Sequence, residues 1–397
     1  MSVGVCIINK NGVALAADSA GTLSAKKMFY NSMDKVFKIS SNNVLGAIAY
    51  GNTTLHNVSI DIILNLFSNY LDEKVKLSDL ENVIDFFKDF FKDNWNYLGY
   101  DTCEKIDCQS LIKDLVDEWG NKIKNVISLP DSYSKIELVL KELENIINRS
   151  IKIKDYDVSN YINEEYSSYF NERMSIVCKE LDEFSDLKEH LWNLIRNFFN
   201  LSLTNEKNNC IGVLFAGFGE KLVFPSYVHL NIYNCIGGNL KFEVIEKYNE
   251  DGSNAKILPL AQPQTINTFC KGISDEMSLV IPNLLTEQIN NTLNNLPNDL
   301  TVEQKNKISQ LFASIPNELS TEISNKSRNE EIEPLISSVK VLPLPEMAFL
   351  AENLVNITSL KRLYFLDNNQ QTVGGPVDVA TLSMSHGFEW IKNKNNK

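Results

Sequence analysis

The first nineteen residues contain two short apolar runs separated by a polar turn. Val3, Val5 and Ile7 alternate as in a strand, and small or apolar residues fill positions 13–17. Between them lies Asn9-Lys10-Asn11-Gly12, and an Asn-Gly pair favours the positive φ angles of a two-residue hairpin turn. The pattern predicts a β-hairpin from residue 2, with Asn11 and Gly12 at positive φ. We expect no signal peptide or propeptide before it.

Apolar spacing predicts two further strands and a helix before residue 72. The strands are expected over 36–39 and 44–49, and Thr53 or Thr54 is expected to cap the helix. The residues with the spacing of one helix face are Ile60, Ile63, Leu64, Phe67 and Leu71. These positions would form the apolar, buried face of the helix.

The segment 72–207 is polar and has helical spacing. Ser78-Asp-Leu-Glu81 has the form of a capping box and predicts a helix start. Further predicted helices are 111–127, 136–147 and a long helical stretch over 161–199. The segment is thus expected to be a helical insertion.

Strands return after residue 207. The predicted strands are 210–217, 222–230, 241–245, 362–366, 377–382 and 388–391. The predicted helical regions are 262–269, 284–296, 302–315, 319–327 and 343–358. We expect one elaborated domain whose core comprises residues 1–71 and 208–397, with the insertion at 72–207 and a second helical insertion at about 275–335.

Composition narrows the class of partner. The 397 residues include 38 Lys and Arg against 51 Asp and Glu, and the net charge of −13 argues against nucleic acid or an anionic membrane. Seven cysteines without a regular framework favour a reducing compartment, and no run is long enough to span a membrane, so we expect a cytoplasmic protein. The four histidines are scattered, and no metal or organic cofactor is implied. The basic tail at 392–397 is expected to be a frayed terminus.

Several stretches carry a family resemblance. They are Gly12-Val-Ala-Leu-Ala-Ala-Asp-Ser19, Asp34-Lys-Val-Phe-Lys-Ile39, Leu45-Gly-Ala-Ile-Ala-Tyr-Gly51 and, near the end, Val373-Gly-Gly-Pro-Val-Asp-Val-Ala380. In this order and spacing they resemble the proteasome β-subunit family of N-terminal-nucleophile hydrolases. The resemblance implies an α+β fold, a four-layer αββα sandwich, here with large helical insertions. It also implies peptide or protein substrates and leaves homo-oligomerisation open.

The resemblance implies a catalytic set. In the family the first mature residue is Thr or Ser, and its hydroxyl attacks a peptide carbonyl. The matching residue is Ser2, exposed if Met1 is removed, and the freed α-amine, with a reference pKa of about 7.7–8.0, could act as the base. Asp18 and Lys35 match the family's acid and lysine. These residues predict peptide-bond hydrolysis through an acyl-enzyme ester.

Further roles follow from the same resemblance. Backbone N–H groups of Tyr50 and Gly51 match the oxyanion-hole turn, and Ile48 matches the floor of the substrate pocket, which implies an apolar or small side chain before the scissile bond. Ser274 is the expected supporting serine on a separate loop.

One segment departs from the family pattern. Members usually carry an Asp and a Ser before the Gly-Gly of the closing strand, whereas Gln370-Gln-Thr-Val373 precedes Gly374 here. Thr372 is the expected substitute for the hydroxyl, and the acid is missing unless Asp367 reaches the site.

Other interpretations of the same residues stay open. Ser after a removable Met is common, Asp18 and Ser19 could simply cap a turn, and Lys26 or Lys27 could replace Lys35. A non-catalytic assembly or binding module on the same fold is the first alternative function. A small-molecule amidase that uses the same nucleophile is the second.

Overall fold

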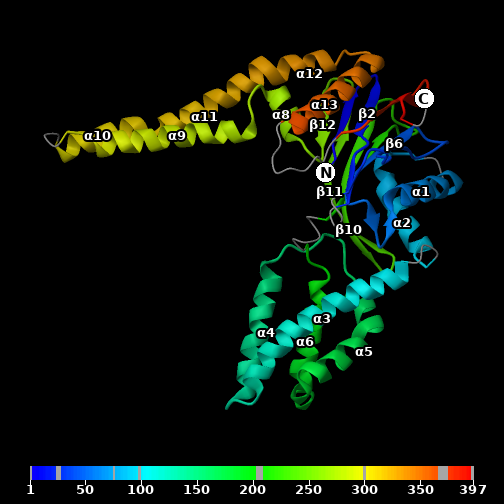
Figure 1. Cartoon of the computed structure of the whole chain (residues 1–397), viewed down its shortest axis with the longest axis vertical. Helices are drawn as coiled ribbons and strands as arrows, with labels where there is room; N and C mark the ends of the chain where they lie inside the picture. Colours follow the sequence, from blue (N-terminus) through cyan, green and yellow to red (C-terminus); the bar gives the residue numbers. More distant parts are fainter. Residues whose placement is uncertain are drawn as a thin grey trace. The chain divides into compact units, whose positions relative to one another are not determined.

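The computed structural model describes residues 2–23, 28–74, 77–96, 100–202, 209–297, 301–364 and 374–394. The chain forms two compact units. The first unit comprises Met1–Tyr50, Phe215–Tyr227 and Tyr248–Lys397, and the second comprises Gly51–Leu214 and Val228–Lys247. The protein is a mixed α and β structure with antiparallel strand pairs (Figure 1).

A five-stranded sheet forms the centre of the first unit. Its strands run in the order β12 (Ala255–Leu260), β1 (Gly4–Asn9), β2 (Gly12–Asp18), β13 (Val377–Ser383) and β14 (Gly387–Lys392). Every neighbouring pair is antiparallel. The predicted hairpin and the strands predicted over 377–382 and 388–391 are therefore confirmed. Strand β12 was not predicted, because Lys256 and Pro259 interrupt its apolar pattern; a proline is compatible with β12 because this strand lies at the sheet edge.

The turn between β1 and β2 differs from the prediction. Asn9 pairs with Gly12, and Asn11 is not at positive φ, while Gly12 has φ +150°. The Asn9 side chain accepts a hydrogen bond from the Asn11 N–H at 2.8 Å and donates to the carbonyl oxygens of Val339 at 2.8 Å and Leu342 at 3.0 Å. These side-chain bonds, rather than a left-handed Asn11, shape the turn.

A second sheet has the strand order β11 (Asn239–Asn249), β10 (Ser226–Ile236), β9 (Ile211–Gly217), β6 (Leu45–Gly51) and β5 (Val36–Lys38). Within the first unit, β5 contacts β2 and β13 of the central sheet. Gly46 on β6 lies against the Phe388 ring and the Leu15 side chain, and a Cβ at this position would meet them at 3.0 and 3.2 Å. The two sheets thus pack face to face within the first unit. Two-stranded ribbons pair β3 (Gly21–Leu23) with β4 (Met28–Tyr30) and β7 (Thr54–Leu55) with β8 (Val58–Ser59).

Helices cover the other face of the central sheet. Helix α13 (Leu344–Tyr364) contacts β1, β2 and β13, and α12 (Glu333–Val339) contacts β12. Val3, Val5, Ile7, Ala14, Ala16, Met347, Ala351 and Val355 all belong to the buried cluster at this contact. The first unit therefore contains a helix layer, a sheet and a second sheet. Because α13 continues to Tyr364, the strand predicted over 362–366 is wrong at 362–364, and 365–366 lie outside the described residues.

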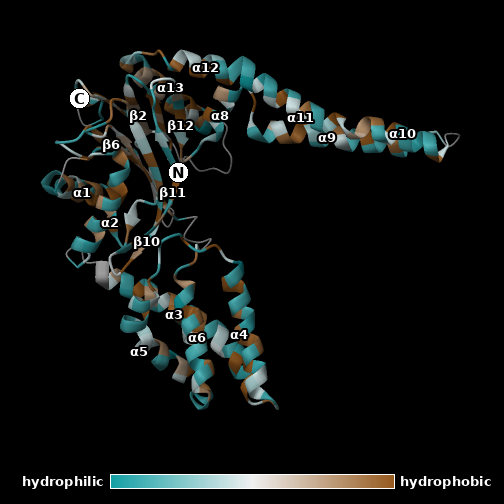
Figure 2. Ribbon diagram, turned by 180° about the vertical axis from the view of Figure 1, so that it is seen from behind, coloured by the Kyte–Doolittle hydropathy of each residue, from teal (hydrophilic) through white to brown (hydrophobic). Residues whose placement is uncertain are grey.

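A long antiparallel helical hairpin follows α8 (Gln264–Lys271) in the first unit. Helix α9 (Asp275–Asn294) contacts α10 (Val302–Ala313) and α11 (Ile315–Lys326), and a π-helical segment, Ser327–Ile332, leads into α12. No residue of α9, α10 or α11 is fully buried. Hydrophobic and hydrophilic residues alternate along these helices (Figure 2). The hairpin thus contributes little to the core of the unit.

The second unit is mostly helical. Its helices are α1 (Ile60–Lys74), α2 (Val83–Asn94), α3 (Tyr100–Ile127), α4 (Ser132–Arg149), α5 (Ser159–Val177) and α6 (Ser185–Phe198), with 3-10 turns at Leu80–Asn82 and Lys179–Glu183. The predicted buried face of α1 is confirmed. Its predicted cap is wrong, because Thr53 precedes β7 and Thr54 lies within it. The cap near Ser78 is Asp79, whose side chain accepts from the Glu81 N–H.

Candidate active site

A buried ion pair lies where β2 ends and β5 begins. Asp18 is the last residue of β2, and Lys35 immediately precedes β5. The Lys35 Nζ atom lies 2.6 Å from Asp18 Oδ1, and the two residues are 5% and 1% exposed. Because the hairpin and the second sheet pack together, two residues 17 positions apart meet in the interior of the first unit. The structure thus brings together the acid and the lysine selected from the sequence.

Asp18 also binds the start of the chain. Its Oδ1 atom accepts a hydrogen bond from the Val3 N–H at 2.8 Å, and the Asp18 N–H donates to the Val3 carbonyl at 3.1 Å. Its Oδ2 atom accepts from the N–H groups of Gly374 at 3.2 Å and Ala20 at 3.3 Å. Ser2, which is 8% exposed, is therefore one residue from an amide that the buried carboxylate binds.

The environment of Lys35 lowers the pKa of its ammonium group. Burial lowers the pKa of the Lys35 ammonium below its ordinary value of 10.5, because a charged group loses hydration in the interior. The charge and hydrogen bond of Asp18 oppose this change. Two more distant groups also act, since Lys394 lowers the pKa of Lys35 and Asp378 raises it. A buried, paired lysine with a lowered pKa is a candidate for proton-transfer chemistry.

The predicted oxyanion-hole residues lie at the end of β6. The Lys35 carbonyl oxygen accepts from the Ala49 N–H at 2.9 Å, so Tyr50 directly follows a residue bonded to Lys35. Gly51 has φ +88°, and a Cβ there would overlap the Cys210 carbonyl oxygen, so glycine is required by the backbone. Gly51 belongs to the second unit. The oxyanion role of Tyr50 and Gly51 stays a prediction.

The remaining predicted site residues have other surroundings. Ile48 is fully buried, and Gly4 of β1 lies against its side chain, so its role as a pocket floor stays a prediction. Ser274 is the N-cap of α9 and accepts from the Met277 N–H at 3.1 Å, and its supporting role is likewise untested. Thr372 and Asp367 lie outside the described residues.

Sequence reasoning missed two charged residues close to Lys35. Asp378 lies on β13 in a stretch that was matched only as a strand, and Lys394 lies in the tail expected to be frayed. Lys394 instead forms an ion pair with Asp378 at 2.6 Å, and both side chains are nearly buried. The only signal was an acid within the apolar run Val377–Ala380, because an acidic residue in a buried strand needs a partner.

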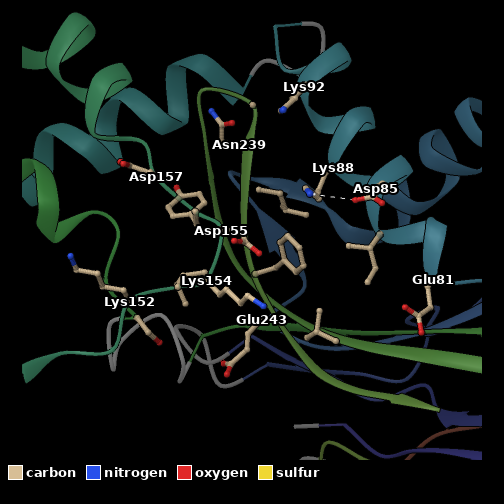
Figure 3. A pocket seen from close by; sticks show the side chains of 18 of the residues that line it. Glu81, Asp85, Lys88, Lys92, Lys152, Lys154, Asp155, Asp157, Asn239 and Glu243 are labelled. Carbon is tan, nitrogen blue, oxygen red and sulfur yellow. Dashed lines mark hydrogen bonds and ion pairs between the residues drawn. The ribbon is translucent and has the colours of Figure 1, made fainter.

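A separate cavity lies in the second unit (Figure 3). It measures about 830 Å³ and is lined by α2, the segment 151–157 and β11. Lysines and acids share its wall; Lys88 pairs with Asp85 at 3.4 Å, and Lys247 pairs with Glu81 at 2.6 Å. This balance of charges singles out no class of ligand.

The described residues were also searched for metal-binding groups and for membrane-spanning helices. Among them, no group of three or more His, Cys, Asp or Glu side chains is arranged to hold a metal ion. Within the same ranges, no helix combines the length and the apolar run needed to cross a bilayer. Cys6 is fully buried in β1, and burial raises the pKa of its thiol.

Comparison with protein-family models and with curated proteins finds no match. Among solved structures, the chain is similar to Anbu (ancestral beta-subunit) from Yersinia bercovieri. The similarity covers 99% of this chain and 88% of that chain, with 11% identity and a TM-score of 0.28. A TM-score this low does not assign a fold or a function.

Proposed function

We propose that the protein is an N-terminal-nucleophile hydrolase that cleaves peptide bonds with Ser2 once Met1 has been removed. One observation carries the proposal: the buried Asp18 carboxylate binds both the Lys35 ammonium and the N–H of Val3, the residue that follows Ser2. Removing two charges from water is costly. A surface salt bridge or a simple turn cap would form without that cost, so neither alternative accounts for the burial of this pair.

The chemistry uses the two functional groups of one residue. The Ser2 Oγ atom bonds to the carbonyl carbon of the substrate while the free α-amine accepts the hydroxyl proton. The C–N bond then breaks, the departing amine takes that proton, and an ester remains on Ser2. Water attacks this ester with the α-amine as base, the C–O bond breaks, and the proton returns to Oγ.

The buried pair supports this step electrostatically. A charged Lys35 favours the neutral, basic form of the Ser2 amine and stabilises negative charge that develops on Oγ. Asp18 holds Lys35 at 2.6 Å and binds the Val3 N–H with the same oxygen atom, which fixes the geometry of all three. The N–H groups of Tyr50 and Gly51 would receive the carbonyl oxygen of the substrate, and Ile48 would lie below its side chain.

The proposal includes the four-layer αββα sandwich. The helix layer, the central sheet and the part of the second sheet that packs on it within the first unit would be three of the layers. The fourth layer, of helices, is part of the proposal. Self-association of such subunits is part of the same proposal, and the mass of the native particle in solution tests it.

The test of function uses a peptidyl β-lactone, which acylates an active hydroxyl by opening its ring. The wild-type chain should gain the mass of one whole probe, and peptide mapping should locate it on Ser2. Ser2→Thr, which keeps a hydroxyl, should also be labelled, whereas Ser2→Ala should not. Ser, Thr and Ala are all small, so Met1 should be removed to the same extent from the wild-type chain and from both variants.

Other outcomes reassign the function. Labelling that persists in Ser2→Ala would place the nucleophile elsewhere. Absence of labelling on a chain that carries a free Ser2 amine would favour the assembly module. Hydrolysis of small amides without hydrolysis of peptides would favour the amidase.

A further inference from the structure

A second buried group of charges lies close to the Asp18–Lys35 pair. Lys394 Nζ lies 2.6 Å from Asp378 Oδ2 and 2.7 Å from Asp34 Oδ1. The Lys394 backbone N–H donates to the other oxygen of Asp378 at 2.8 Å. The Lys394 and Asp378 side chains are only 6% and 5% exposed, while Asp34 is half exposed. Burial of this kind distinguishes the group from an ordinary surface ion pair.

Lys394 also binds the backbone directly before Lys35. Its Nζ atom donates to the Met33 carbonyl oxygen at 2.8 Å. Together with Asp34 and Asp378 this gives three acceptors, which matches the three donors of an ammonium group. Met33 and Asp34 are the two residues that precede Lys35. Lys394 thus fixes the short segment that presents the Lys35 side chain.

The segment 33–35 is also hydrogen-bonded to the chain that follows Asp18. The Met33 N–H donates to the Ser19 carbonyl at 3.0 Å, and Ser19 follows Asp18 in the chain. The Ser19 hydroxyl donates to the Pro376 carbonyl at 2.7 Å, just before β13. Residues 33–35 are therefore bound between the end of β2 and the Asp378–Lys394 pair.

Four charged groups surround or approach Lys35. Asp18 contacts it, Asp34 precedes it in the chain, and Asp378 and Lys394 act on it without contact. The positive charge of Lys394 disfavours the charged form of Lys35, whereas the negative charges of Asp18 and Asp378 favour it. The opposing charges of Lys394 and Asp378 therefore both affect the protonation of Lys35.

We propose that Lys394 is a positioning residue of the candidate site, which fixes the Met33–Lys35 backbone against β13 and places a positive charge near the Lys35 amine. As a role in catalysis, this inference rests on the proposed function. The electrostatic effect of Lys394 on the titration of Lys35 can be measured even if the protein shows no activity.

The test follows the Cε resonance of Lys35 through a pH titration of the full chain labelled with [¹³C]lysine. The signal is assigned by its absence in Lys35→Arg. Lys394→Met removes a positive charge, so the midpoint of Lys35 should move to higher pH. Asp378→Asn removes a negative charge, so the midpoint should move to lower pH. Lys392→Met is the matched control, because Lys392 pairs with Glu352 at the exposed surface, and it should leave the midpoint unchanged.

Opposite shifts distinguish an electrostatic positioning role from general damage to the fold. The proposal would be overturned if the Lys35 midpoint shifts in the same direction in Lys394→Met and Asp378→Asn. It would also be overturned if the midpoint does not shift in one or both of the folded variants. If Lys394→Met does not fold, the decision rests on Lys394→Arg, expected close to the wild-type midpoint, and on Asp378→Asn, expected below it; any other pair of results overturns the proposal.

Activity provides the functional arm of the test. The alkaline limb of the labelling rate against pH should move upward in Lys394→Met together with the Lys35 midpoint. If the wild-type chain is not labelled at all, the proposed function is wrong while the titration still measures the coupling. If labelling occurs but its pH profile is the same in Lys394→Met and in wild type, the function stands and the positioning role is wrong.

Discussion

Two buried carboxylates, one in each unit, have the same exposure and very different partners. Asp18 in the first unit is 1% exposed and binds a lysine ammonium at 2.6 Å together with backbone N–H groups. Glu104 in the second unit is also 1% exposed. Its Oε1 atom accepts from the hydroxyls of Tyr161 at 2.8 Å and Tyr166 at 2.9 Å, and its Oε2 atom accepts from the Gly237 N–H at 2.9 Å.

Under the proposed function, the first arrangement is reactive and the second is structural. Glu104 on α3 ties together α5 and the turn between β10 and β11, and its neutral donors offer no group that changes charge near neutral pH. Asp18 binds a lysine of lowered pKa and the amide that follows Ser2. Both carboxylates are buried, so burial alone does not distinguish them; their partners do.

The largest expected effect comes from breaking the Asp18–Lys35 pair. Asp18→Asn and Lys35→Met each leave one buried polar group without its partner, which costs about 3–5 kcal/mol of stability. Under the proposed function, each should also lower the β-lactone labelling rate by about a hundredfold or more, because the proposed electrostatic support of Ser2 is lost. Urea unfolding and labelling kinetics measure the two effects.

The double variant Asp18→Asn with Lys35→Met sharpens this test. Removal of both charges should recover most of the stability, because no buried charge remains unpaired. Labelling should stay low. Recovery of labelling together with stability would mean that the pair is only structural.

The Glu104 network should show the reverse pattern. Glu104→Gln places an amide among three donors and should destabilise the protein by about 1–3 kcal/mol. The labelling rate measured under native conditions should match wild type. Tyr166→Phe, which removes one of the donors, is the matched smaller change. A loss of labelling in folded Glu104→Gln would contradict the contrast between the two carboxylates.

A pH effect of intermediate size should follow from Lys35. Its pKa in the folded protein lies below the ordinary 10.5, so between these two values the unfolded chain binds more protons and stability rises with pH. The penalty for burying a charged lysine is fully present below the folded pKa and is relieved as the pH approaches 10.5. The free energies of unfolding of wild type and Lys35→Met should be measured from pH 7 to about 10.5. The stability of wild type relative to Lys35→Met should increase as the pH rises. A constant difference would mean that Lys35 titrates as an exposed lysine.

The smallest effects are expected on the helical hairpin of α9, α10 and α11. Leu279 and Leu311 are 69% and 68% exposed, so Leu279→Ser and Leu311→Ser should each change stability by at most about 0.5 kcal/mol. Labelling should be unchanged. A large loss of stability measured by urea unfolding would show that another surface covers these leucines in solution.

The elements near the start of the chain could be predicted because their information is local. Alternating apolar residues and a turn define the β1–β2 hairpin, and helical spacing defines the buried face of α1. Strand β12 escaped prediction because its pairing with β1, some 250 residues earlier, compensates for a weak pattern. The turn conformation was wrong because Asn9 bonds to residues near the end of α12 that no local pattern reveals.

The candidate site was accessible from sequence only where a resemblance supplied positions. Ser2, Asp18 and Lys35 were selected in this way, and the last two lie in contact, although their roles await experiment. Lys394 was assigned to a frayed tail because lysines and asparagines at a chain end carry no signal of burial. Its three acceptors come from Met33, Asp34 and Asp378, and only the folded sheet brings these groups together.

The most direct test of the central claim is the state of the first residue. Intact-mass analysis with sequencing of the first residue should be performed on the purified native protein before and after reaction with the β-lactone. The account predicts a chain that lacks Met1, carries a free amine on Ser2 and gains one probe at that residue. A chain that retains Met1 or carries an acetylated Ser2 would have no free amine on Ser2 to act as the base and would contradict the hydrolase proposal.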